Sequence, residues 1–467
     1  MKGLLIAGTA SGVGKTTVAL AIMAGLRRRG LAVQPFKCGP DFLDTGHHTR
    51  ICRRTARNLD TWMLSADANQ SVLRNAARDA DMVVAEGMMG LFDGKSGNSE
   101  AGSSAEIAKL LKLPVVLVVD AAKSARSIAA VVLGFEMFDP ELRLAGVILN
   151  RVASERHYGM LQAAIASSCR TKILGWLPRE PKIAIPERHL GLQGAEQMYA
   201  SGEEHIETQI DALAALAEQY FDLGGLMELE CGLPLDGPAH NVAPLSADAL
   251  PLRVGMASDL AFSFYYEDNL DMLREQGVEI VRFSPINDRG LPDDLDALYL
   301  GGGYPELYAK QLSGNRRMLD AVRAFADSGR PVYAECGGML YLSQSLSDAE
   351  GTAYPMAGVL PLSMEMTGKL VQFGYATVEF TEDCLLGNKG TAIRGHSFHY
   401  SRIAAQDGIG TSYRVQYSMS GKEELEGFHR GNILASYIHL HFRANPVVAE
   451  NFVTAIRRVR RLQAVTA

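Results

Sequence analysis

Residues 4–17 read L-L-I-A-G-T-A-S-G-V-G-K-T-T, and this stretch decides the fold of the first half of the chain. A short apolar run (4–7) leads into a glycine-rich loop, and a helix-like segment follows at residues 18–29. A strand, a glycine loop and a helix in this order form the phosphate-binding unit of many parallel α/β proteins. The sequence therefore predicts a parallel sheet with a nucleotide site near its first strand.

The loop supplies the candidate nucleotide ligands. Gly12 and Gly14 let the backbone amides turn toward a polyphosphate, which the following helix N-terminus also attracts. We expect Lys15 to reach the terminal phosphates of ATP and Thr16 to ligate Mg²⁺. Thr17 is a further expected nucleotide contact. Together these residues predict ATP and Mg²⁺ as cofactors.

The spacing of the loop departs from the usual GxxxxGK[ST] pattern. Counting back from Gly14, the position of the first glycine holds Thr9, and Gly8 lies one residue further away. The loop is therefore longer than the usual version. A glycine turn that binds no ligand is the alternative interpretation.

Acidic residues beyond the loop are candidates for completing the metal site. Asp41 and Asp44 lie in K-C-G-P-D-F-L-D-T-G, and Glu86 ends the apolar run 82–85. Carboxylates at strand ends are well placed for a metal, so Asp41 and Glu86 are predicted metal ligands. Lys37 is expected to neutralise charge on a transferring phosphoryl group. Asp44 and Asp93 are assigned to substrate binding, although each such charge is also typical of a cap or a solvated loop.

Asn150 and Arg151 follow the apolar run 146–149. Arg151 is a candidate for nucleotide recognition. For Asn150, contact with the base and a simple turn at the strand end both remain open.

Two series of strand-like segments indicate two domains. The chain has 467 residues, more than a single core usually supports. Apolar runs alternate with helix-like stretches in both halves, which is the rhythm of a parallel α/β sheet. The runs are residues 4–7, 82–85, 115–119 and 146–149, and then 253–257, 279–283, 297–300 and 331–334.

The boundary between the halves follows from composition. A helix-like segment at residues 203–221 precedes a stretch rich in Gly, Pro, Asn, Asp and Ser. We therefore predict an ATP-binding domain at 1–225, a linker at 226–250 and a second α/β domain at 251–467. Beyond residue 355, strands at 373–380 and 393–400 precede a last helix near 446–462.

Composition and charge exclude several classes of protein. A net charge of -7 argues against nucleic acid as the main partner. Six scattered cysteines without a CxxC pair suggest neither a disulfide framework nor a thiolate metal site, and a reducing cytoplasm fits them best. No apolar run is long enough for a membrane span, and the first one is too short for a signal peptide.

A candidate nucleophile lies in R-P-V-Y-A-E-C-G-G-M-L-Y-L. Cys336 follows an apolar strand (332–334) and precedes Gly337 and a helix-like run, the pattern of a nucleophile elbow. The helix N-terminus is expected to lower the pKa of the thiol. Amides near Gly302, in the run 301–303, and near Gly337 are expected to hold an oxyanion. A buried structural cysteine is the alternative.

The thiol requires a base, and A-S-Y-I-H-L-H-F offers His439 and His441 on one face of a strand-like segment. His439 is the predicted base. His396 and His399 fall on opposite faces of an extended segment, so they do not suggest a shared metal site.

The motifs resemble a known family. E-C-G-G (335–338), L-G-G-G-Y-P-E (300–306) and the late histidine resemble a class I glutamine amidotransferase domain. Joined to an N-terminal domain similar to dethiobiotin synthetase, they resemble the cobyrinic acid a,c-diamide synthase family over about residues 2–460. Further matching pieces are K-C-G-P-D-F-L-D-T-G-H-H (37–48), N-L-D-T-W-M (58–63), E-G-M-M-G-L-F-D-G (86–94), I-P-E-R-H-L-G-L (185–192) and D-L-A-F-S-F-Y-Y-E-D-N-L (259–270).

This resemblance implies amidation of the a- and c-acetate carboxylates of cobyrinic acid. Each carboxylate would be activated by ATP with Mg²⁺ as an acyl phosphate and aminated with ammonia from glutamine. The partners implied are a tetrapyrrole acid, glutamine and ATP, and a homodimer is left open. Many class I domains carry an acid two residues after the histidine, where this chain has His441, so a dyad of Cys336 and His439 is expected. Ser397 stands where the family has a Glu.

Three alternatives are kept. The same chemistry on another tetrapyrrole, such as nickel sirohydrochlorin or siroheme, shares nearly all of these motifs. Amidation of later corrinoid side chains, as in cobyric acid synthase, matches the motifs less well. A nucleotide-dependent switch or partitioning ATPase shares the opening loop but leaves Cys336 unexplained.

Overall fold

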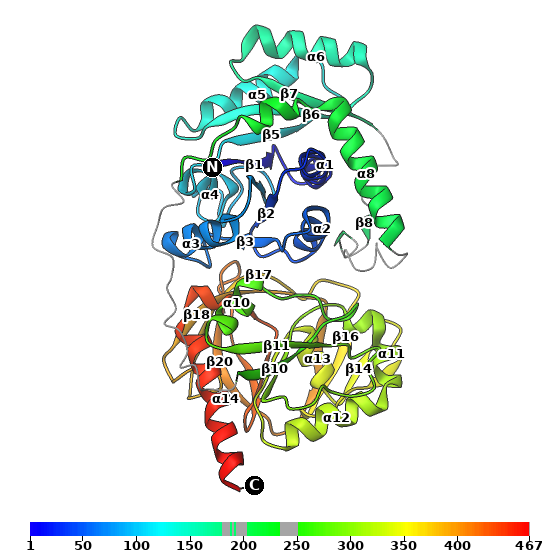
Figure 1. Ribbon diagram of the computed structural model, residues 1–467, viewed down its shortest axis with the longest axis vertical. Coiled ribbons are helices and arrows are strands. Elements are labelled where there is room, and N and C mark those ends of the chain that lie inside the picture. Colours follow the sequence, from blue (N-terminus) through cyan, green and yellow to red (C-terminus); the bar gives the residue numbers. More distant parts are fainter. Residues whose placement is uncertain (180–186, 189–190, 193–202, 234–250, 467) are drawn as a thin grey trace. The chain divides into compact units, whose positions relative to one another are not determined.

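The computed structural model describes residues 1–179, 187–188, 191–192, 203–233 and 251–466 (Figure 1). The chain forms two compact units, residues 1–239 and 240–467. The stretch expected to be a linker, 226–250, begins inside the first unit, because Gly3 N donates to Leu229 O and Cys231 N donates to Met1 O. Its remainder, 234–250, lies outside the described residues, as do residues 185, 186, 189 and 190 of the motif at 185–192.

The first unit is built on a parallel sheet with the strand order β3-β2-β4-β1-β5-β6-β7. The strands are nearly continuous apolar runs because both faces of the sheet are buried. Their bounds are β1 (Lys2–Gly8), β2 (Val33–Cys38), β3 (Arg57–Leu59), β4 (Met82–Glu86), β5 (Val115–Asp120), β6 (Leu144–Val152) and β7 (Ile173–Pro178). A separate short pair comprises β8 (Glu187–Arg188) and β9 (Gly191–Leu192).

Helices cover both faces of this sheet, with α1, α2 and α8 on one side and α3 and α4 on the other (Figure 1). Serine side chains begin three of the helices by accepting a backbone N–H: Ser65, Ser103 and Ser154. The bounds are α1 (Lys15–Arg28), α2 (Leu43–Cys52), α3 (Ala66–Ala77), α4 (Ser104–Leu110), α5 (Ser127–Phe138), α6 (Glu155–Ser168), α8 (Glu203–Tyr220) and α9 (Leu223–Met227).

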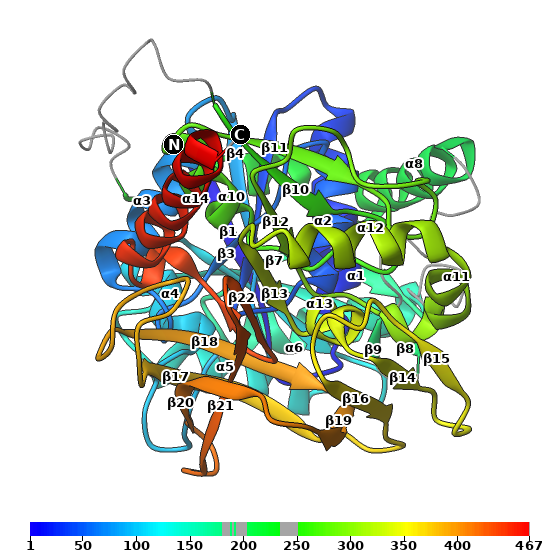
Figure 2. The same ribbon diagram turned by 90° about the horizontal axis from the view of Figure 1, so that it is seen from below.

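The second unit contains a large mixed sheet with the order β11-β10-β12-β13-β22-β21-β20-β17-β18-β23. Its first five strands are parallel and the rest pair antiparallel; β17, β18, β20 and β21 lie side by side in Figure 2. The bounds are β10 (Leu252–Ala257), β11 (Val278–Phe283), β12 (Ala297–Leu300), β13 (Val332–Glu335), β17 (Gln372–Phe380), β18 (Ala392–His399), β20 (Gly410–Tyr417), β21 (Glu423–Arg430), β22 (Ile433–Ser436) and β23 (His439–Leu440).

Two apolar clusters cover the two faces of this sheet. Consecutive residues of β13 belong to different clusters, Ala334 to one and Tyr333 to the other, because strand side chains alternate in direction. A smaller sheet has the order β15-β14-β16-β19. The remaining elements are β14 (Ser345–Ser347), β15 (Ala353–Pro355), β16 (Leu362–Met366), β19 (Ser401–Gln406), α10 (Glu267–Glu275), η2 (Pro305–Tyr308), α11 (Ala309–Gly314), α12 (Arg316–Asp327), α13 (Gly337–Leu342), η3 (Phe442–Ala444) and α14 (Val447–Thr466).

The predicted fold class, two tandem α/β units, is confirmed. Every apolar run named from the sequence forms a strand, and the helices predicted at 18–29 and 446–462 are present as α1 and α14. Helix α1 begins earlier than predicted, at Lys15, so Lys15 and Thr16 lie in its first turn. In the part of the chain that the structure describes, no helix is long and apolar enough to span a membrane.

Candidate active sites

The loop between β1 and α1 has the conformation that its glycines predict. Gly12 and Gly14 adopt φ values of 76° and 89°, a left-handed region that favours glycine. At Gly14 the approach is also close, because a Cβ there would lie 2.1 Å from Nδ2 of Asn150. Only glycine fits this position without displacing the Asn150 amide.

Asn150 and Arg151 support the loop from the end of β6. Asn150 Nδ2 donates to Val13 O at 2.8 Å, and Asn150 Oδ1 accepts from Arg151 N at 2.8 Å. Arg151 Nη2 donates to Gly12 O at 2.9 Å, and its Nη1 lies 2.5 Å from Asp120 Oδ2. The Asn150 amide is therefore occupied by backbone contacts, which favours the structural interpretation over contact with a base.

Lys15 and Thr16 lie at the start of α1, where the helix dipole attracts phosphate. Lys15 Nζ donates to Ala10 O across the loop at 3.1 Å. Burial, and after it the nearby charge of Lys37, lowers the pKa of Lys15. Thr16 Oγ1 donates to Glu86 Oε1 at 2.6 Å, which joins the loop to the end of β4. Thr17 lies in the same helical turn.

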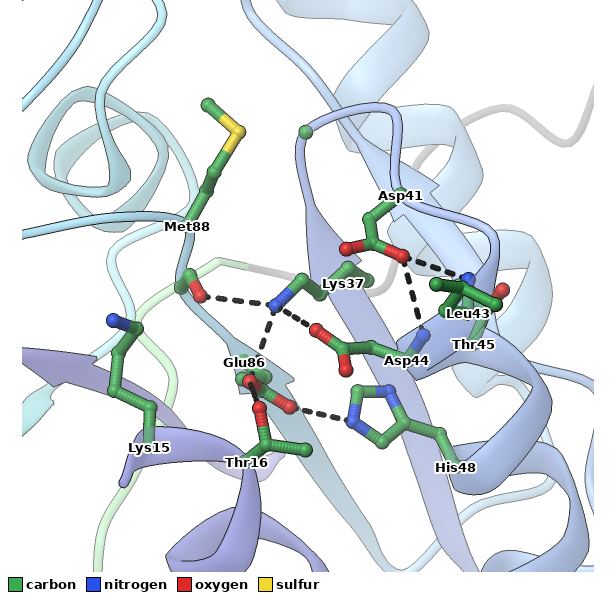
Figure 3. A network of polar contacts seen from close by, with 12 residues as sticks. Lys15, Thr16, Lys37, Asp41, Leu43, Asp44, Thr45, His48, Glu86 and Met88 are labelled. Atoms are coloured by element: carbon green, nitrogen blue, oxygen red, sulfur yellow. Dashed lines mark hydrogen bonds and ion pairs between the residues drawn. The ribbon is translucent and has the colours of Figure 1, made fainter. Parts of the chain in front are cut away.

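A buried charged cluster lies beside the loop, at the carboxyl ends of β2 and β4 (Figure 3). Lys37 and Glu86 are partners in the parallel register of the two strands, and Lys37 Nζ lies 3.1 Å from Glu86 Oε1. Lys37 Nζ also lies 2.5 Å from Asp44 Oδ2 and donates to Gly87 O. His48 Nε2 lies 2.7 Å from Glu86 Oε2. The structure therefore brings Thr16, Lys37, Asp44 and Glu86 together, as the sequence suggested, and adds His48.

Mutual neutralisation lets these charges remain buried. Burial raises the pKa of Asp44 to about 7, with the Glu86 charge acting in the same direction. Burial also opposes the charged forms of Glu86 and Lys37. Nevertheless, Lys37 and then His48 hold the pKa of Glu86 well below its usual range, while Asp44 and Glu86 raise the pKa of Lys37. Glu86 is thus a carboxylate beside the phosphate loop, as a metal ligand must be.

Asp41 and Asp93 have local roles in the structure. Asp41 Oδ1 accepts from Leu43 N at 2.7 Å and from Asp44 N at 3.2 Å, so this carboxylate caps the start of α2. Asp93 Oδ2 accepts from Gly90 N at 2.9 Å. The metal role predicted for Asp41 finds no support in these contacts, because the oxygen is directed toward its own helix.

Sequence reasoning missed His48. The signal was present, since His48 follows Asp44 by four residues on α2 and therefore lies on the same helical face. Its ring reaches the same carboxylate, Glu86, that Thr16 and Lys37 contact.

These side chains fit a magnesium ion shared with phosphates. Mg²⁺ usually takes one or two protein oxygens and completes its shell with water and phosphate. Thr16 Oγ1 and Glu86 Oε1 supply two adjacent oxygens, and Asp44 Oδ1 is buried without a hydrogen-bond partner among the described residues. Within those residues no group of three His, Cys, Asp or Glu side chains could hold an ion.

Replacing Lys37 with Met is expected to destabilise the first unit by about 3–5 kcal/mol, because it leaves two buried carboxylates unneutralised. Lys37 is 5% exposed and contacts both Asp44 and Glu86. Urea unfolding at neutral pH measures the loss, with the surface variant Lys2→Met as a control expected to differ little. Near pH 5 the loss should be smaller, since Asp44 without Lys37 takes up a proton more readily. Equal stability of K37M and wild type would contradict the assigned charges.

In the second unit, Cys336 occupies a sharp turn between β13 and α13. Its backbone has φ 45° and ψ −101°, a strained combination for a residue other than glycine. Cys336 N donates to Ser436 O at 2.7 Å, which fixes the turn against β22. This is the predicted elbow geometry.

The predicted lowering of the thiol pKa is wrong for the structure. Burial raises the pKa of Cys336 to about 12, and the nearby Glu306 acts in the same direction. Burial also raises the pKa of Glu306, to about 7. The backbone N–H of Gly337, which lowers the pKa of the thiol, does not offset these effects. The thiol is therefore protonated at neutral pH, and a nearby base must remove its proton.

The glycine loop after β12 lies beside the elbow. Gly302 N is already occupied, because it donates to Phe264 O at 3.2 Å. The oxyanion role predicted for the Gly302 amide is thus not available in this structure. The next amide, Gly303 N, would lie 3.1 Å from a Cβ placed on Gly337, so these two residues are close neighbours. Gly337 begins α13, and its amide has no partner within the helix.

His439 also lies beside this glycine loop. A Cβ on Gly302 would be 2.4 Å from His439 Cε1 and 3.2 Å from Nε2, so the ring edge rests on the glycine loop. Its other side faces Glu335, with Nδ1 3.5 Å from Oε2. The ring is stacked on His396, with centroids 5.0 Å apart. His441 is directed elsewhere, with its ring 4.5 Å from that of Tyr266.

Introducing a methyl group at Gly302 is expected to impair severely the glutamine hydrolysis that the sequence resemblance implies. The Gly302→Ala side chain would overlap His439 Cε1 and displace the imidazole. We expect the kcat for glutamine hydrolysis to fall roughly 100-fold, while ammonium-driven product formation persists. Gly314→Ala is a suitable control, because its Cβ would meet no atom within 4 Å. Full glutaminase activity in G302A would contradict this placement of His439.

Both candidate sites lie in regions that match known protein families. Residues 4–192 match the family described as the CobQ/CobB/MinD/ParA nucleotide binding domain, and residues 253–447 match the CobB/CobQ-like glutamine amidotransferase domain. A cobyrinate a,c-diamide synthase from Syntrophotalea carbinolica is 43% identical over 457 residues, with 97% of this chain and 98% of the relative covered. The chain belongs to the cobyrinate a,c-diamide synthase family.

Other relatives give the same result. Cobyrinate a,c-diamide synthases from Listeria monocytogenes and Salmonella typhimurium are each 42% identical, covering 98% and 97% of this chain and 100% and 98% of their own. Membership of the cobyrinate a,c-diamide synthase family makes the chain a glutamine-hydrolysing ligase with a nucleotide-binding unit. A switch or partitioning ATPase does not account for the amidotransferase match over residues 253–447.

Proposed function

We propose that this chain converts the a- and c-acetate carboxylates of cobyrinic acid into amides, with ATP and glutamine as co-substrates. The observation that carries the proposal is the likeness to cobyrinate a,c-diamide synthases along nearly the whole chain; the match to the relative from Syntrophotalea carbinolica covers 97% of it. Two further findings support it. A buried thiol lies in an elbow beside a histidine and a glycine loop, and a phosphate loop is joined to a buried carboxylate.

The second unit releases ammonia from glutamine in this proposal. Cys336 Sγ attacks the side-chain amide carbon while His439 removes the thiol proton. The amides of Gly303 and Gly337 stabilise the developing oxyanion, because Gly303 N lies close to Gly337, the residue after the nucleophile. His439 then returns the proton to the departing nitrogen. Water hydrolyses the thioester and regenerates the thiol.

The first unit activates the acid. The substrate carboxylate attacks the γ-phosphorus of ATP, which Lys15 and the α1 N-terminus hold; the bond from that phosphorus to the β,γ-bridging oxygen breaks, ADP leaves and an acyl phosphate results. Ammonia then displaces phosphate and forms the amide. Thr16 and Glu86 would hold Mg²⁺, which neutralises charge on the phosphates when bound. Lys37 holds Glu86 in its charged form.

The identity of the macrocycle is tested by offering several. Purified protein is incubated with ATP, Mg²⁺, glutamine and one macrocycle at a time. The macrocycles are cobyrinic acid, hydrogenobyrinic acid, nickel sirohydrochlorin and siroheme. The masses of the products are measured by mass spectrometry. The proposal expects diamidation of cobyrinic acid at the highest kcat/KM. Preferential diamidation of nickel sirohydrochlorin or siroheme would establish the alternative function instead.

Two smaller proposals concern the cellular location of the protein and its oligomeric state. We place the protein in a reducing cytoplasm, since all six cysteines are free thiols and Cys336 must remain one. Cell fractionation tests this placement. A homodimer stays a prediction, which analytical ultracentrifugation of the purified protein decides.

A further inference from the structure

We propose that Glu335 is the positioning residue for His439. Its carboxylate lies 3.5 Å from Nδ1 of the imidazole and favours the proton on that nitrogen, so that Nε2 is left to receive the proton of the Cys336 thiol. The inference rests on the proposed glutaminase role of the second unit. Glu335 extends the dyad expected from sequence to a triad. The third member is the residue immediately before the nucleophile and not one after the histidine.

Glu335 is held rigidly at the end of β13. Its side chain is 1% exposed. Oε1 accepts from Tyr333 Oη at 2.6 Å and from Leu440 N at 3.1 Å, while Oε2 accepts from Tyr299 Oη at 3.2 Å. The hydroxyls come from two neighbouring strands, and the amide belongs to the residue after His439. Donors from three segments thus fix both oxygens.

The placement of the ring assigns a role to each nitrogen. His439 Nδ1 lies 3.5 Å from Glu335 Oε2, while Nε2 lies on the side of Gly302, 3.2 Å from where a Cβ on that residue would be. A carboxylate accepts hydrogen bonds and therefore favours the tautomer with the proton on Nδ1. That tautomer leaves a lone pair on Nε2, on the side of the glycine loop.

The carboxylate also stabilises the charge that catalysis creates. When the thiol proton moves to Nε2, sulfur bonds to the amide carbon, the carbonyl electron pair moves to oxygen, and His439 becomes an imidazolium. A buried imidazolium is costly without a partner charge. Glu335 provides that charge without taking up the proton. The proton then passes from Nε2 to the leaving nitrogen, the C–N bond breaks, and ammonia departs.

The other titratable groups near His439 and Cys336 act differently from Glu335. His396 is stacked on His439, and burial followed by the charges of His439 and His441 lowers its pKa well below the usual value, so it stays neutral. Tyr266 Oη lies 2.8 Å from Nδ1 of His396. Two further carboxylates, those of Glu306 and Glu426, face the thiol and raise its pKa.

Glu426 offers a matched control. It is buried like Glu335 and its pKa is raised by burial to about 7. Its oxygens accept from Ser436 Oγ at 2.5 Å, Tyr437 N at 2.5 Å and Gly427 N at 2.8 Å, a different network from that of Glu335. Replacing it removes a buried carboxylate near the thiol without removing the Nδ1 partner of His439.

The direction of a pH shift separates two roles for Glu335. As a negative charge near the thiol it raises the pKa of Cys336, so its loss alone would move thiol reactivity to lower pH. As the partner of His439 it favours the thiolate–imidazolium pair, so its loss would move reactivity to higher pH. Glu335→Gln is informative because its NH₂ can donate to Nδ1 and impose the wrong tautomer.

The experiment follows alkylation of Cys336 by iodoacetamide against pH in the full-length protein, together with glutamine hydrolysis. For E335Q we expect the alkylation midpoint to move to higher pH and the kcat to fall roughly 100-fold, with a KM within about threefold of wild type. E335D should recover part of the kcat. E426Q should leave the midpoint unchanged or move it lower. An E335Q midpoint at or below that of wild type would overturn the inference.

Two further measurements exclude a merely structural effect. Saturating 6-diazo-5-oxo-norleucine should still label one Cys336 per molecule of E335Q, and near-UV circular dichroism should match wild type. If E335Q does not fold, E335D decides, since an unchanged kcat in the folded E335D variant would contradict a positioning role. Failure of wild-type protein to hydrolyse glutamine would instead overturn the proposed function.

Discussion

Replacing Cys336 with Ser is expected to abolish glutamine-driven amidation and to leave ammonium-driven amidation close to wild type. The reason is that a serine hydroxyl is a far weaker acid and nucleophile than a thiol, and Cys336 is the only candidate nucleophile in the described elbow. We expect a loss on the order of 10³-fold or more with glutamine. Product formation is measured with glutamine and, separately, with an ammonium salt.

Cys384→Ser is the matched control for this prediction. Cys384 is a free, half-buried thiol in the same unit, outside the elbow. It should retain both activities. Loss of ammonium-driven amidation in C336S would contradict the assignment of glutamine hydrolysis and amide formation to separate units, provided that the variant is folded.

Removing the amine of Lys15 should lower amidation and leave glutamine hydrolysis intact, the reverse of the result expected for Cys336→Ser. Lys15→Ala is expected to lower ATP-dependent amidation roughly 1000-fold with either nitrogen source, because the γ-phosphate loses its cation. Lys15 lies in the first turn of α1 with Nζ over the loop, 3.1 Å from Ala10 O. Glutamine hydrolysis should continue, since Cys336 and His439 belong to the other unit.

The control for this variant is Lys2→Ala. Lys2 lies in the same unit, but its exposed amine contacts Glu228 and Glu230. It should amidate as wild type does. Unchanged amidation in K15A would show that the loop does not hold the reacting phosphate, whereas loss of glutamine hydrolysis as well would point to misfolding or coupling between the units.

Local chemistry explains why much of this protein was predictable from sequence. The phosphate loop depends on glycines in left-handed conformations and on an apolar strand before it, and both features are visible in residues 4–17. The elbow is similarly local, because Cys336 stands between β13 and α13. The position of Lys37 and Glu86 at strand ends was predicted, whereas their ion pair is a finding of the structure.

Features that depend on distant contacts were not predictable. Glu335 meets His439 only because β13 and β23 come together in the fold, although they are about a hundred residues apart in sequence. The Gly302 amide is occupied by Phe264, a pairing that a glycine run does not reveal. The thiol pKa was predicted in the wrong direction because burial outweighs the hydrogen bond of the Gly337 backbone.

The central claim is that one chain transfers the amide nitrogen of glutamine to two carboxylates of cobyrinic acid at the expense of ATP. The most direct measurement incubates purified protein with cobyrinic acid, ATP, Mg²⁺ and glutamine labelled with ¹⁵N in its side-chain amide, followed by mass spectrometry and NMR of the corrinoid. We expect a product with labelled amides on its a- and c-acetate arms, absent without ATP. An unaltered corrinoid, or amidation without the label, would contradict it.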